Sequence, residues 1–222
     1  MTESNQKKGL RKQYESFFAP WGRILAKTSI TPNMISVSSV AVSVLSCIIY
    51  ASGSIIDPSL GLLGGTLLLG LSSLLDMMDG SLARAKGIAG HFGALFDRTL
   101  DRVSEFFFLL GIMAGGYVIP ELVFFCFEGM ILASYVRSTA ELRGGLSMDS
   151  TSGIFERKEK LILLSIGCVV EILLIEDVVT SIWPFPTIGI LAIIIFIIGL
   201  ASNISALQRL LYARDYHKSK EG

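Results

Sequence analysis

Long blocks of apolar residues constrain most strongly what this chain can fold into. Of its 222 residues, 51% are hydrophobic and only 17% are charged. A water-soluble domain of this length could not bury so much apolar surface, because the surface of a folded domain shrinks slowly relative to its volume. The apolar residues also come in continuous stretches rather than in alternating patterns. We therefore expect a lipid bilayer to be the solvent for most of the chain.

Six of these stretches approach the length of a transmembrane helix, which needs about 20 predominantly apolar residues. Several reach that length only with their polar flanks, which we expect to continue the helices into the membrane interface. The predicted spans are Met34–Gly53, Ser59–Leu75, Val103–Ile119, Leu122–Val136, Leu161–Ile175 and Thr187–Leu207. The sequence thus predicts an all-α integral membrane protein with six transmembrane helices.

The positive charges support this number of spans. With six spans, all 19 Lys and Arg residues fall before the first span, in the second and fourth connections, or after the sixth. The other connections carry Asp57, Glu121, Glu176 and Asp177 and no cation. Because cytoplasmic loops are enriched in Lys and Arg, both termini are expected to be cytoplasmic, in a cell membrane.

The N-terminal segment differs from the spans. In Gly9–Lys27, aromatic residues and leucines mix with cations at roughly helical spacing, which is typical of an amphipathic helix in the headgroup layer. A soluble extension is the alternative, and the polar first residues predict no cleaved signal peptide. We expect a cytoplasmic N-terminus with this helix in residues 1–30, a six-helix domain in 31–210 and a polar cytoplasmic tail in 211–222.

Four aspartates flank the connection between the second and third spans. Asp76 and Asp79 are three residues apart, and Asp97 and Asp101 are four apart. Each spacing places a pair on one helical face, so a helical hairpin can bring all four carboxylates together. Such a group needs cations, and clustered oxygen ligands suit hard ions such as Mg²⁺. Two such ions can hold a phosphoryl group during its transfer.

Other residues of this segment suit a phosphate ligand. Gly80 and Gly93 allow a bulky ligand to approach the carboxylates closely, and the planar guanidinium of Arg84 can contact a phosphate in a bidentate way. Two alternatives remain open. The aspartates could pair structurally with Arg98 and Arg102 beside them, or they could line the ion pathway of a transporter. Acids inside other spans give the transporter some support, and their roles stay open: Glu105, Glu128 and Glu171.

The whole string reads D-x2-D-G-x2-A-R-x8-G-x3-D-x3-D, from Asp76 to Asp101. It resembles the signature of the CDP-alcohol phosphatidyltransferase family, whose six-span layout with a preceding amphipathic helix is similar to the one predicted here. The resemblance implies that all four aspartates hold two Mg²⁺ or Mn²⁺ ions. It also implies that Asp101 is the general base toward the acceptor hydroxyl and that CMP leaves. A homodimer is a further implication, whereas no nucleic acid partner is expected.

The resemblance also suggests a site for the CDP-linked lipid, either CDP-diacylglycerol or CDP-archaeol. Members of the family carry a Pro-Asn or Pro-Asp pair at the start of the first span, and Pro32 and Asn33 fit this pattern, with Ser36 one turn later. Local sequence alone would also explain a helix start here. The expected lipid-binding residues are Pro32, Asn33, Ser36, Asp76, Asp79, Gly80, Arg84 and Gly93.

The connection between the fourth and fifth predicted spans indicates which alcohol is the acceptor. It resembles the branch of the family that accepts inositol phosphate, in which Arg137, Arg157 and Lys160 would bind the acceptor. Two positions depart from that branch, since Thr139 stands where it has Arg and Lys160 replaces its final Arg. Glycerol 3-phosphate, as in phosphatidylglycerophosphate synthases, is the alternative acceptor. A plain cationic loop is also consistent with this stretch.

Overall fold

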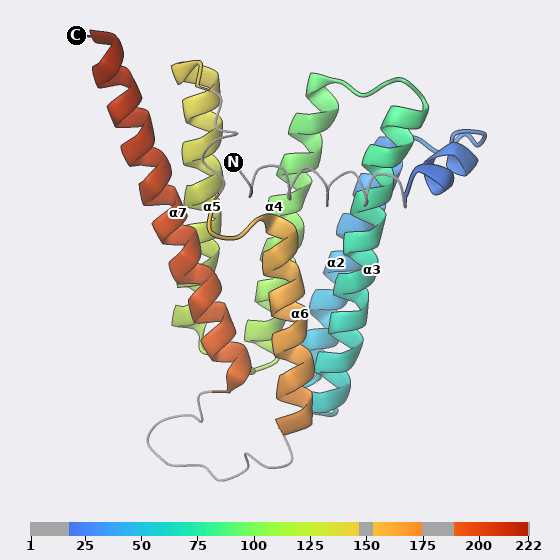
Figure 1. Ribbon diagram of the computed structural model, residues 1–222. Helices are drawn as coiled ribbons and strands as arrows, with labels where there is room; N and C mark the ends of the chain where they lie inside the picture. Colours follow the sequence, from blue (N-terminus) through green and yellow to red (C-terminus); the bar gives the residue numbers. More distant parts are fainter. Residues whose placement is uncertain (1–17, 147–152, 175–188, 222) are drawn as a thin grey trace. The chain divides into compact units, whose positions relative to one another are not determined.

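The computed structural model describes residues 18–146, 153–174 and 189–221. These residues form helices, and no strand occurs among them. A helix over residues 18–25 precedes six longer ones (Figure 1). The six are α2 (Pro32–Ser52), α3 (Pro58–Ala85), α4 (His91–Ala114), α5 (Pro120–Gly144), α6 (Arg157–Leu174) and α7 (Ile190–Glu221).

Each of the six long helices overlaps one of the six predicted spans, although α4 begins twelve residues before Val103 and ends at Ala114. The end of the fifth predicted span and the start of the sixth lie outside the described residues. The expectation that polar flanks continue the helices is confirmed, since α3 runs ten residues past Leu75 and α7 ends at Glu221. Prolines begin three helices, because a residue without a backbone N–H is tolerated in the first turn. Asp57 caps the start of α3, where its Oδ1 accepts a hydrogen bond of 2.8 Å from the Leu60 N–H.

Four of the helices are long and apolar enough to cross a membrane, namely α2, α3, α5 and α7. Only 28–56% of their most apolar windows is buried within the structure, so these helices present apolar side chains outward, as a bilayer requires. The helices α4 and α6 fall outside this group because they carry more charged residues, which lie between Asp97 and Glu105 in α4 and in the first turn of α6. Of the predicted amphipathic helix, residues 18–25 are helical, and residues 9–17 lie outside the described part.

The chain divides into two compact units, and the boundaries between them fall within α2, α3 and α4. The first comprises Met1–Ser46 and Leu67–Phe108, and the second comprises Cys47–Thr66 and Leu109–Gly222. In the first unit, α2 packs against α3 through small hydroxyl residues, with Ser72 Oγ donating to the Ser39 carbonyl at 2.8 Å. Close packing through small side chains is typical of membrane helices.

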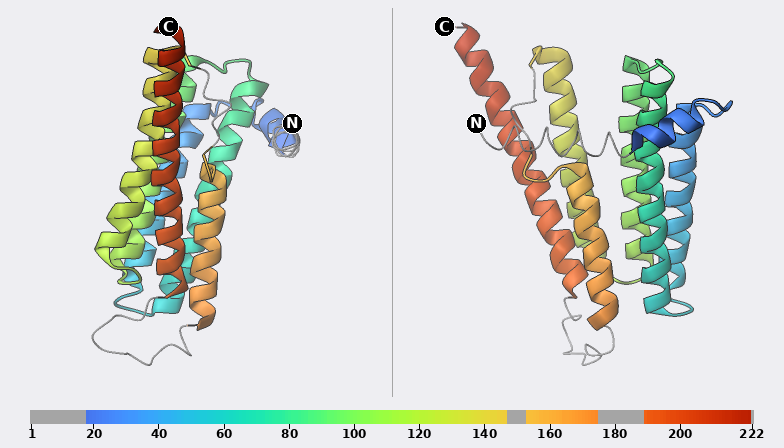
Figure 2. Two further views of the ribbon diagram at one scale, coloured as in Figure 1. Left: turned by 60° about the vertical axis from the view of Figure 1, so that its left-hand side comes forward. Right: turned by 45° about the vertical axis from the view of Figure 1, so that its right-hand side comes forward.

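In the second unit, α7 packs against α5 and α6 and runs beside α5 in all views (Figures 1 and 2). Tyr50 is fully buried, and its hydroxyl lies 3.0 Å from Thr66 Oγ1. The start of α7 is capped by Glu171, whose Oε2 accepts a hydrogen bond of 3.0 Å from the Leu191 N–H. A carboxylate is favourable there because the first N–H groups of a helix lack partners and carry partial positive charge.

Candidate active site

A tight turn between α3 and α4 connects the two pairs of aspartates. Gly87 has a φ of 67°, a left-handed conformation that favours glycine. The Ile88 N–H donates to the Ala83 carbonyl at 3.1 Å, which closes the end of α3. The chain then enters α4 at His91. As the sequence predicted, Asp76 and Asp79 lie in the second half of α3, and Asp97 and Asp101 lie in the first half of α4.

Three of the four aspartates meet across this hairpin. Asp76, Asp97 and Asp101 are half-buried, and each offers a carboxylate oxygen within 4.8 Å of the others. Like charges at such distances repel one another in a medium that screens poorly. A divalent cation relieves this repulsion, and Mg²⁺ prefers an all-oxygen donor set of this kind. The three side chains therefore fit a metal site.

Asp79 lies beside this group and not within it. It is buried, and the hydroxyl of Ser36 on α2 donates a hydrogen bond to its Oδ2. Its charge still interacts with those of Asp76 and Asp97. Ser36, which the sequence suggested as a lipid-binding residue, is thus a direct partner of the fourth aspartate. Ser36 Oγ also lies 3.1 Å from the carbonyl oxygen of Pro32, and since a hydroxyl has a single proton to donate, these two acceptors compete for it.

Hydrogen bonds connect the segment before α2 to the end of α3. Lys86 Nζ donates to the carbonyls of Thr28 and Ile30, at 3.0 and 2.7 Å. Ser81 Oγ donates to the carbonyl of Phe18 at 2.9 Å, in the helix over residues 18–25. These contacts bring the first turn of α2 to the motif. Pro32 begins this helix and Asn33 is exposed beside it, one turn before Ser36.

Arg84 and the two motif glycines lie on the open side of the hairpin. Arg84 is exposed, and its Nη1 would lie 3.5 Å from a Cβ at Gly80, an ordinary contact. Among the residues that the structure describes, no atom lies within 4 Å of a Cβ built on Gly93. Packing among these residues therefore does not require glycine at either position. Both positions leave space that a ligand can occupy.

Alanine at Gly80 or Gly93 should have opposite effects on stability and on activity. Gly80→Ala and Gly93→Ala should each leave the protein as stable or stabilise it by about 0.5–1 kcal/mol, because glycine is unfavourable within a helix. The added methyl should lower kcat/KM about 10- to 100-fold, since overpacking costs about 1–3 kcal/mol. Thermal unfolding and steady-state kinetics on the same preparations would measure both effects.

Gly70→Ala provides the matched control. Gly70 lies in α3, and no atom of the described residues lies within 4 Å of a Cβ built on it, but it is six residues before the first aspartate. We expect this variant to gain the same stability and to keep full activity. Unchanged kinetics in Gly80→Ala and Gly93→Ala would contradict the assignment of these glycines to a ligand.

The proposed acceptor residues belong to the second unit. Arg137 on α5 pairs with Glu141 one turn later, with 2.9 Å between Nε and Oε1. Arg157 begins α6, and Lys160 is buried one turn further on. These positions place Arg157 and Lys160 on one face of the first turn of α6, where two cations can bind one anion.

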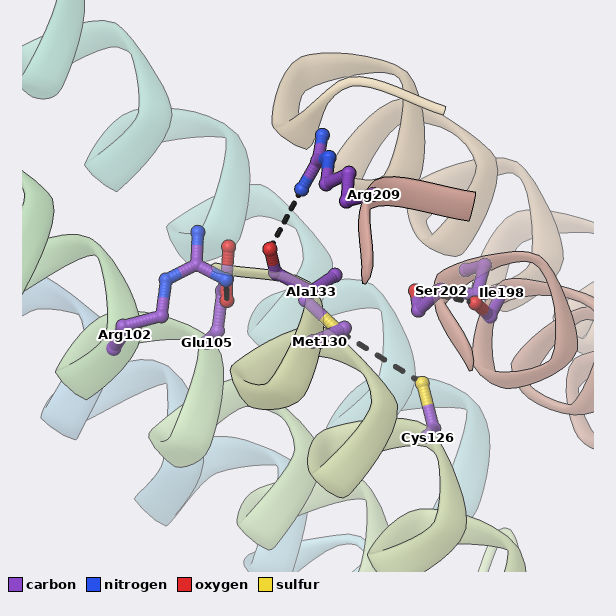
Figure 3. A network of polar contacts seen from close by, with 8 residues as sticks. All are labelled: Arg102, Glu105, Cys126, Met130, Ala133, Ile198, Ser202 and Arg209. Carbon is purple, nitrogen blue, oxygen red and sulfur yellow. Dashed lines mark hydrogen bonds and ion pairs between the residues drawn. The ribbon is translucent and has the colours of Figure 1, made fainter. Parts of the chain in front are cut away.

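Arg209 on α7 is a further cation in this unit that the sequence reasoning missed. Its Nη1 donates to the Ala133 carbonyl at 2.7 Å (Figure 3). Its Nη2 would lie 3.1 Å from a Cβ at Gly153, in the segment that precedes α6. The charges of Arg137 and Glu141 act on it electrostatically. The signal available in the sequence was an arginine two residues after the last predicted span, which the positive-inside rule also explains.

Two of the carboxylates that the sequence left unexplained have partners in the structure. Glu105 forms an ion pair with Arg102, with 2.6 Å between Oε2 and Nη1 (Figure 3). The structural pairing considered for Arg102 is therefore with Glu105, one turn further along α4. Glu171 caps α7 as described above. Glu128 is exposed on α5.

Comparison with known proteins agrees with this geometry. Residues 29–213 match the family model of CDP-alcohol phosphatidyltransferases. Over 147 residues the chain is 33% identical to the archaetidylinositol phosphate synthase of Pyrococcus horikoshii, which covers 66% of this chain and 73% of that protein.

Two crystal structures of the phosphatidylinositol phosphate synthase of Mycobacterium tuberculosis are similar to this fold, both at 26% sequence identity. The structure with CDP-DAG bound gives a TM-score of 0.69 and covers 88% of this chain and 92% of that chain. The structure in complex with manganese and citrate gives a TM-score of 0.70 and covers 88% of each chain.

Proposed function

The chain belongs to the CDP-alcohol phosphatidyltransferase family, and on this basis we propose that it transfers a phosphatidyl or archaetidyl group from a CDP-linked lipid to inositol phosphate. It is a transferase enzyme and a membrane protein. The observation that carries the proposal is the group of Asp76, Asp97 and Asp101, whose oxygens lie within 4.8 Å of one another at the family's motif. The reaction releases CMP and contributes to phospholipid biosynthesis.

The four aspartates hold two divalent ions in this proposal, Mg²⁺ or Mn²⁺. Asp76, Asp97 and Asp101 have the donor set and the spacing for one ion. Asp79 lies beside them and contributes a carboxylate ligand to the two-ion site. Bound ions would neutralise the pyrophosphate of the CDP-lipid and polarise the phosphorus under attack. A solved structure of a similar synthase contains manganese, which supports this assignment.

The remaining steps are performed by side chains of the first unit. Asp101 accepts the proton of the acceptor hydroxyl, and the resulting oxygen attacks the phosphorus on the lipid side of the pyrophosphate. The bond from that phosphorus to the oxygen of CMP breaks, and CMP leaves with the electron pair. Arg84 donates hydrogen bonds to the phosphates as negative charge develops on the leaving group. Pro32, Asn33 and the open space at Gly80 and Gly93 accommodate the nucleotide.

Three cations of the second unit bind the acceptor, namely Arg137, Arg157 and Lys160. A phosphorylated polyol needs cations for its phosphate and polar groups for its hydroxyls. Arg209 joins them, because its guanidinium lies beside Gly153 and interacts with the charge of Arg137. The similarity to an archaetidylinositol phosphate synthase and to a phosphatidylinositol phosphate synthase supports inositol phosphate over glycerol phosphate.

The finer architecture belongs to the same proposal. Residues 31–210 form a catalytic domain in which α4 and α6 also cross the bilayer, which makes six spans. The N-terminal helix lies in the cytoplasmic headgroup layer, and both termini and the active site are cytoplasmic. The exposed Trp21 and Ile24 support this location for the helix over residues 18–25. The enzyme works in the cell membrane as a homodimer.

Release of CMP by the purified protein tests the proposed reaction. Assays would contain Mg²⁺ or Mn²⁺, CDP-diacylglycerol or CDP-archaeol, and either inositol 1-phosphate or glycerol 3-phosphate. We expect release with inositol phosphate and none after addition of a chelator. Release with glycerol phosphate alone would keep the reaction type and contradict the assigned acceptor. Failure with every donor and acceptor, in folded protein, would contradict the proposal as a whole.

A further inference from the structure

Two side chains of α7 contact the short segment that leads into α6. The Ile154 N–H donates a hydrogen bond of 2.9 Å to Ser205 Oγ, across 51 residues of sequence. Arg209 lies one turn further along α7, and its Nη2 would be 3.1 Å from a Cβ at Gly153. Its Nη1 donates to the Ala133 carbonyl of α5 at 2.7 Å (Figure 3). Ser205 and Arg209 therefore lie where α5, α7 and the segment before α6 meet.

The hydroxyl of Ser205 has two hydrogen-bond partners. Ser205 is buried, and its Oγ donates to the Ala201 carbonyl at 2.7 Å, so it acts as the acceptor toward Ile154. Ser202 is also buried on α7, and its Oγ donates to the Ile198 carbonyl at 2.6 Å (Figure 3). In the described part of the chain, this second serine makes only that bond within its own helix. Of the two serines, Ser205 is therefore the one that contacts the segment before α6.

This contact is close to the first turn of α6. Only two residues separate Ile154 from Arg157, and each residue has only two soft backbone dihedrals. The Glu156 N–H donates to Glu159 Oε2 at 2.8 Å, as the glutamate of a capping box does. The Lys160 N–H donates to the Glu156 carbonyl at 3.1 Å. Because the first turn is ordered in this way, the place at which Ile154 is held determines where Arg157 and Lys160 lie.

We propose that Ser205 is a positioning residue for the acceptor, which holds the Ile154 N–H and so places Arg157 and Lys160 in the acceptor site. The inference rests on the proposed function and deepens it, because it gives α7 a part in binding the acceptor phosphate. A hydroxyl that served stability alone would favour neither substrate. Ser205 should act on the acceptor and not on the CDP-lipid, whose binding we assign to the first unit.

Steady-state release of CMP by the full-length protein tests this role, with each substrate varied while the other is saturating. Ser205→Ala should raise the KM for inositol 1-phosphate about 10-fold, since it leaves the Ile154 N–H without its acceptor. The KM for the CDP-lipid should not change. Ser202→Ala is the matched control, because it removes a buried serine hydroxyl from the same helix, and it should change neither KM.

Gly153→Ala disturbs the same contact from its other side. The added methyl would lie 3.1 Å from Ser205 Oγ and from Arg209 Nη2, so these atoms must shift. This variant should also raise the KM for inositol phosphate alone. Because both changes act on one contact, the double variant should raise that KM by less than the product of the two single effects.

Equal increases in both KM values for Ser205→Ala, or the same increase for Ser202→Ala, would overturn the inference. If Ser205→Ala does not fold, Gly153→Ala decides, and an unchanged KM for inositol phosphate in that variant would count against the role of the contact. A wild-type protein that releases no CMP with inositol phosphate would overturn the proposed acceptor and this inference together. An active wild type with the same KM for inositol phosphate as Ser205→Ala would overturn this inference alone.

Discussion

Asp101→Asn is expected to lower the rate of CMP release by about 10²- to 10⁴-fold, the usual contribution of a general base. The amide keeps the size of the side chain but cannot accept the proton of the acceptor hydroxyl at neutral pH. It also removes one negative charge from the group that Asp101 forms with Asp76 and Asp97. The rate would be measured with saturating CDP-lipid and inositol phosphate.

The loss of a metal ligand must be separated from the loss of the base. The assay is therefore repeated at increasing Mn²⁺ until the rate no longer changes, so that weaker metal binding is compensated. Asp215→Asn is the matched control, because Asp215 is exposed on α7 and pairs with its neighbour Arg214. It should keep the full rate. If Asp101→Asn retained more than about a tenth of the wild-type rate at saturating metal, Asp101 would not be the general base.

The motif's helical positions could be predicted because they depend on local spacing. Intervals of three and four residues determine which side chains share a helical face, and the apolar blocks on either side determine that two helices flank the turn. The structure confirms that Asp76 and Asp97 belong to successive helices of a hairpin. The turn itself depends on Gly87, whose positive φ no neighbouring residue could adopt as readily.

The partner of Asp79 could not be predicted in the same way. Ser36 lies 43 residues earlier in the chain, and the contact depends on how α2 rotates against α3. Apolar periodicity is a weak guide to this rotation in a membrane, because side chains facing lipid and side chains facing protein are similarly apolar. For the same reason the sequence could not show that Asp79 lies beside the other three aspartates and not among them.

The contact of Arg209 in the acceptor region could not be predicted from the sequence either. Arg209 lies 76 residues from Ala133, the residue whose carbonyl it contacts, and a cation at the end of a span has an adequate topological explanation. Glu105 is the opposite case, because its partner Arg102 is only three residues away. The sequence suggested a pairing of Arg102 with its neighbour Asp101, although the i,i+3 spacing of Arg102 and Glu105 also indicates that these two side chains can meet.

Removal of a cation from the first turn of α6 should impair the use of inositol phosphate. Arg157→Gln and Lys160→Met each delete a positive charge and keep most of the side chain's length. A hydrogen bond to a charged group is worth about 1.5–3 kcal/mol, so kcat/KM for inositol phosphate should fall about 10- to 150-fold. The KM for the CDP-lipid should stay near its wild-type value, since we assign lipid binding to the first unit.

Lys160 provides the more demanding of the two tests. Its side chain is buried, and a buried ammonium is stable only where negative groups surround it. Lys160→Met should therefore lower the stability of the protein as well as its affinity for the acceptor phosphate, because it removes the charge that those groups interact with. Arg214→Gln, at an exposed position on α7, should change neither property. If Arg157→Gln and Lys160→Met raised the KM for the CDP-lipid as much as that for inositol phosphate, these cations would serve the donor, and the acceptor phosphate would need another site.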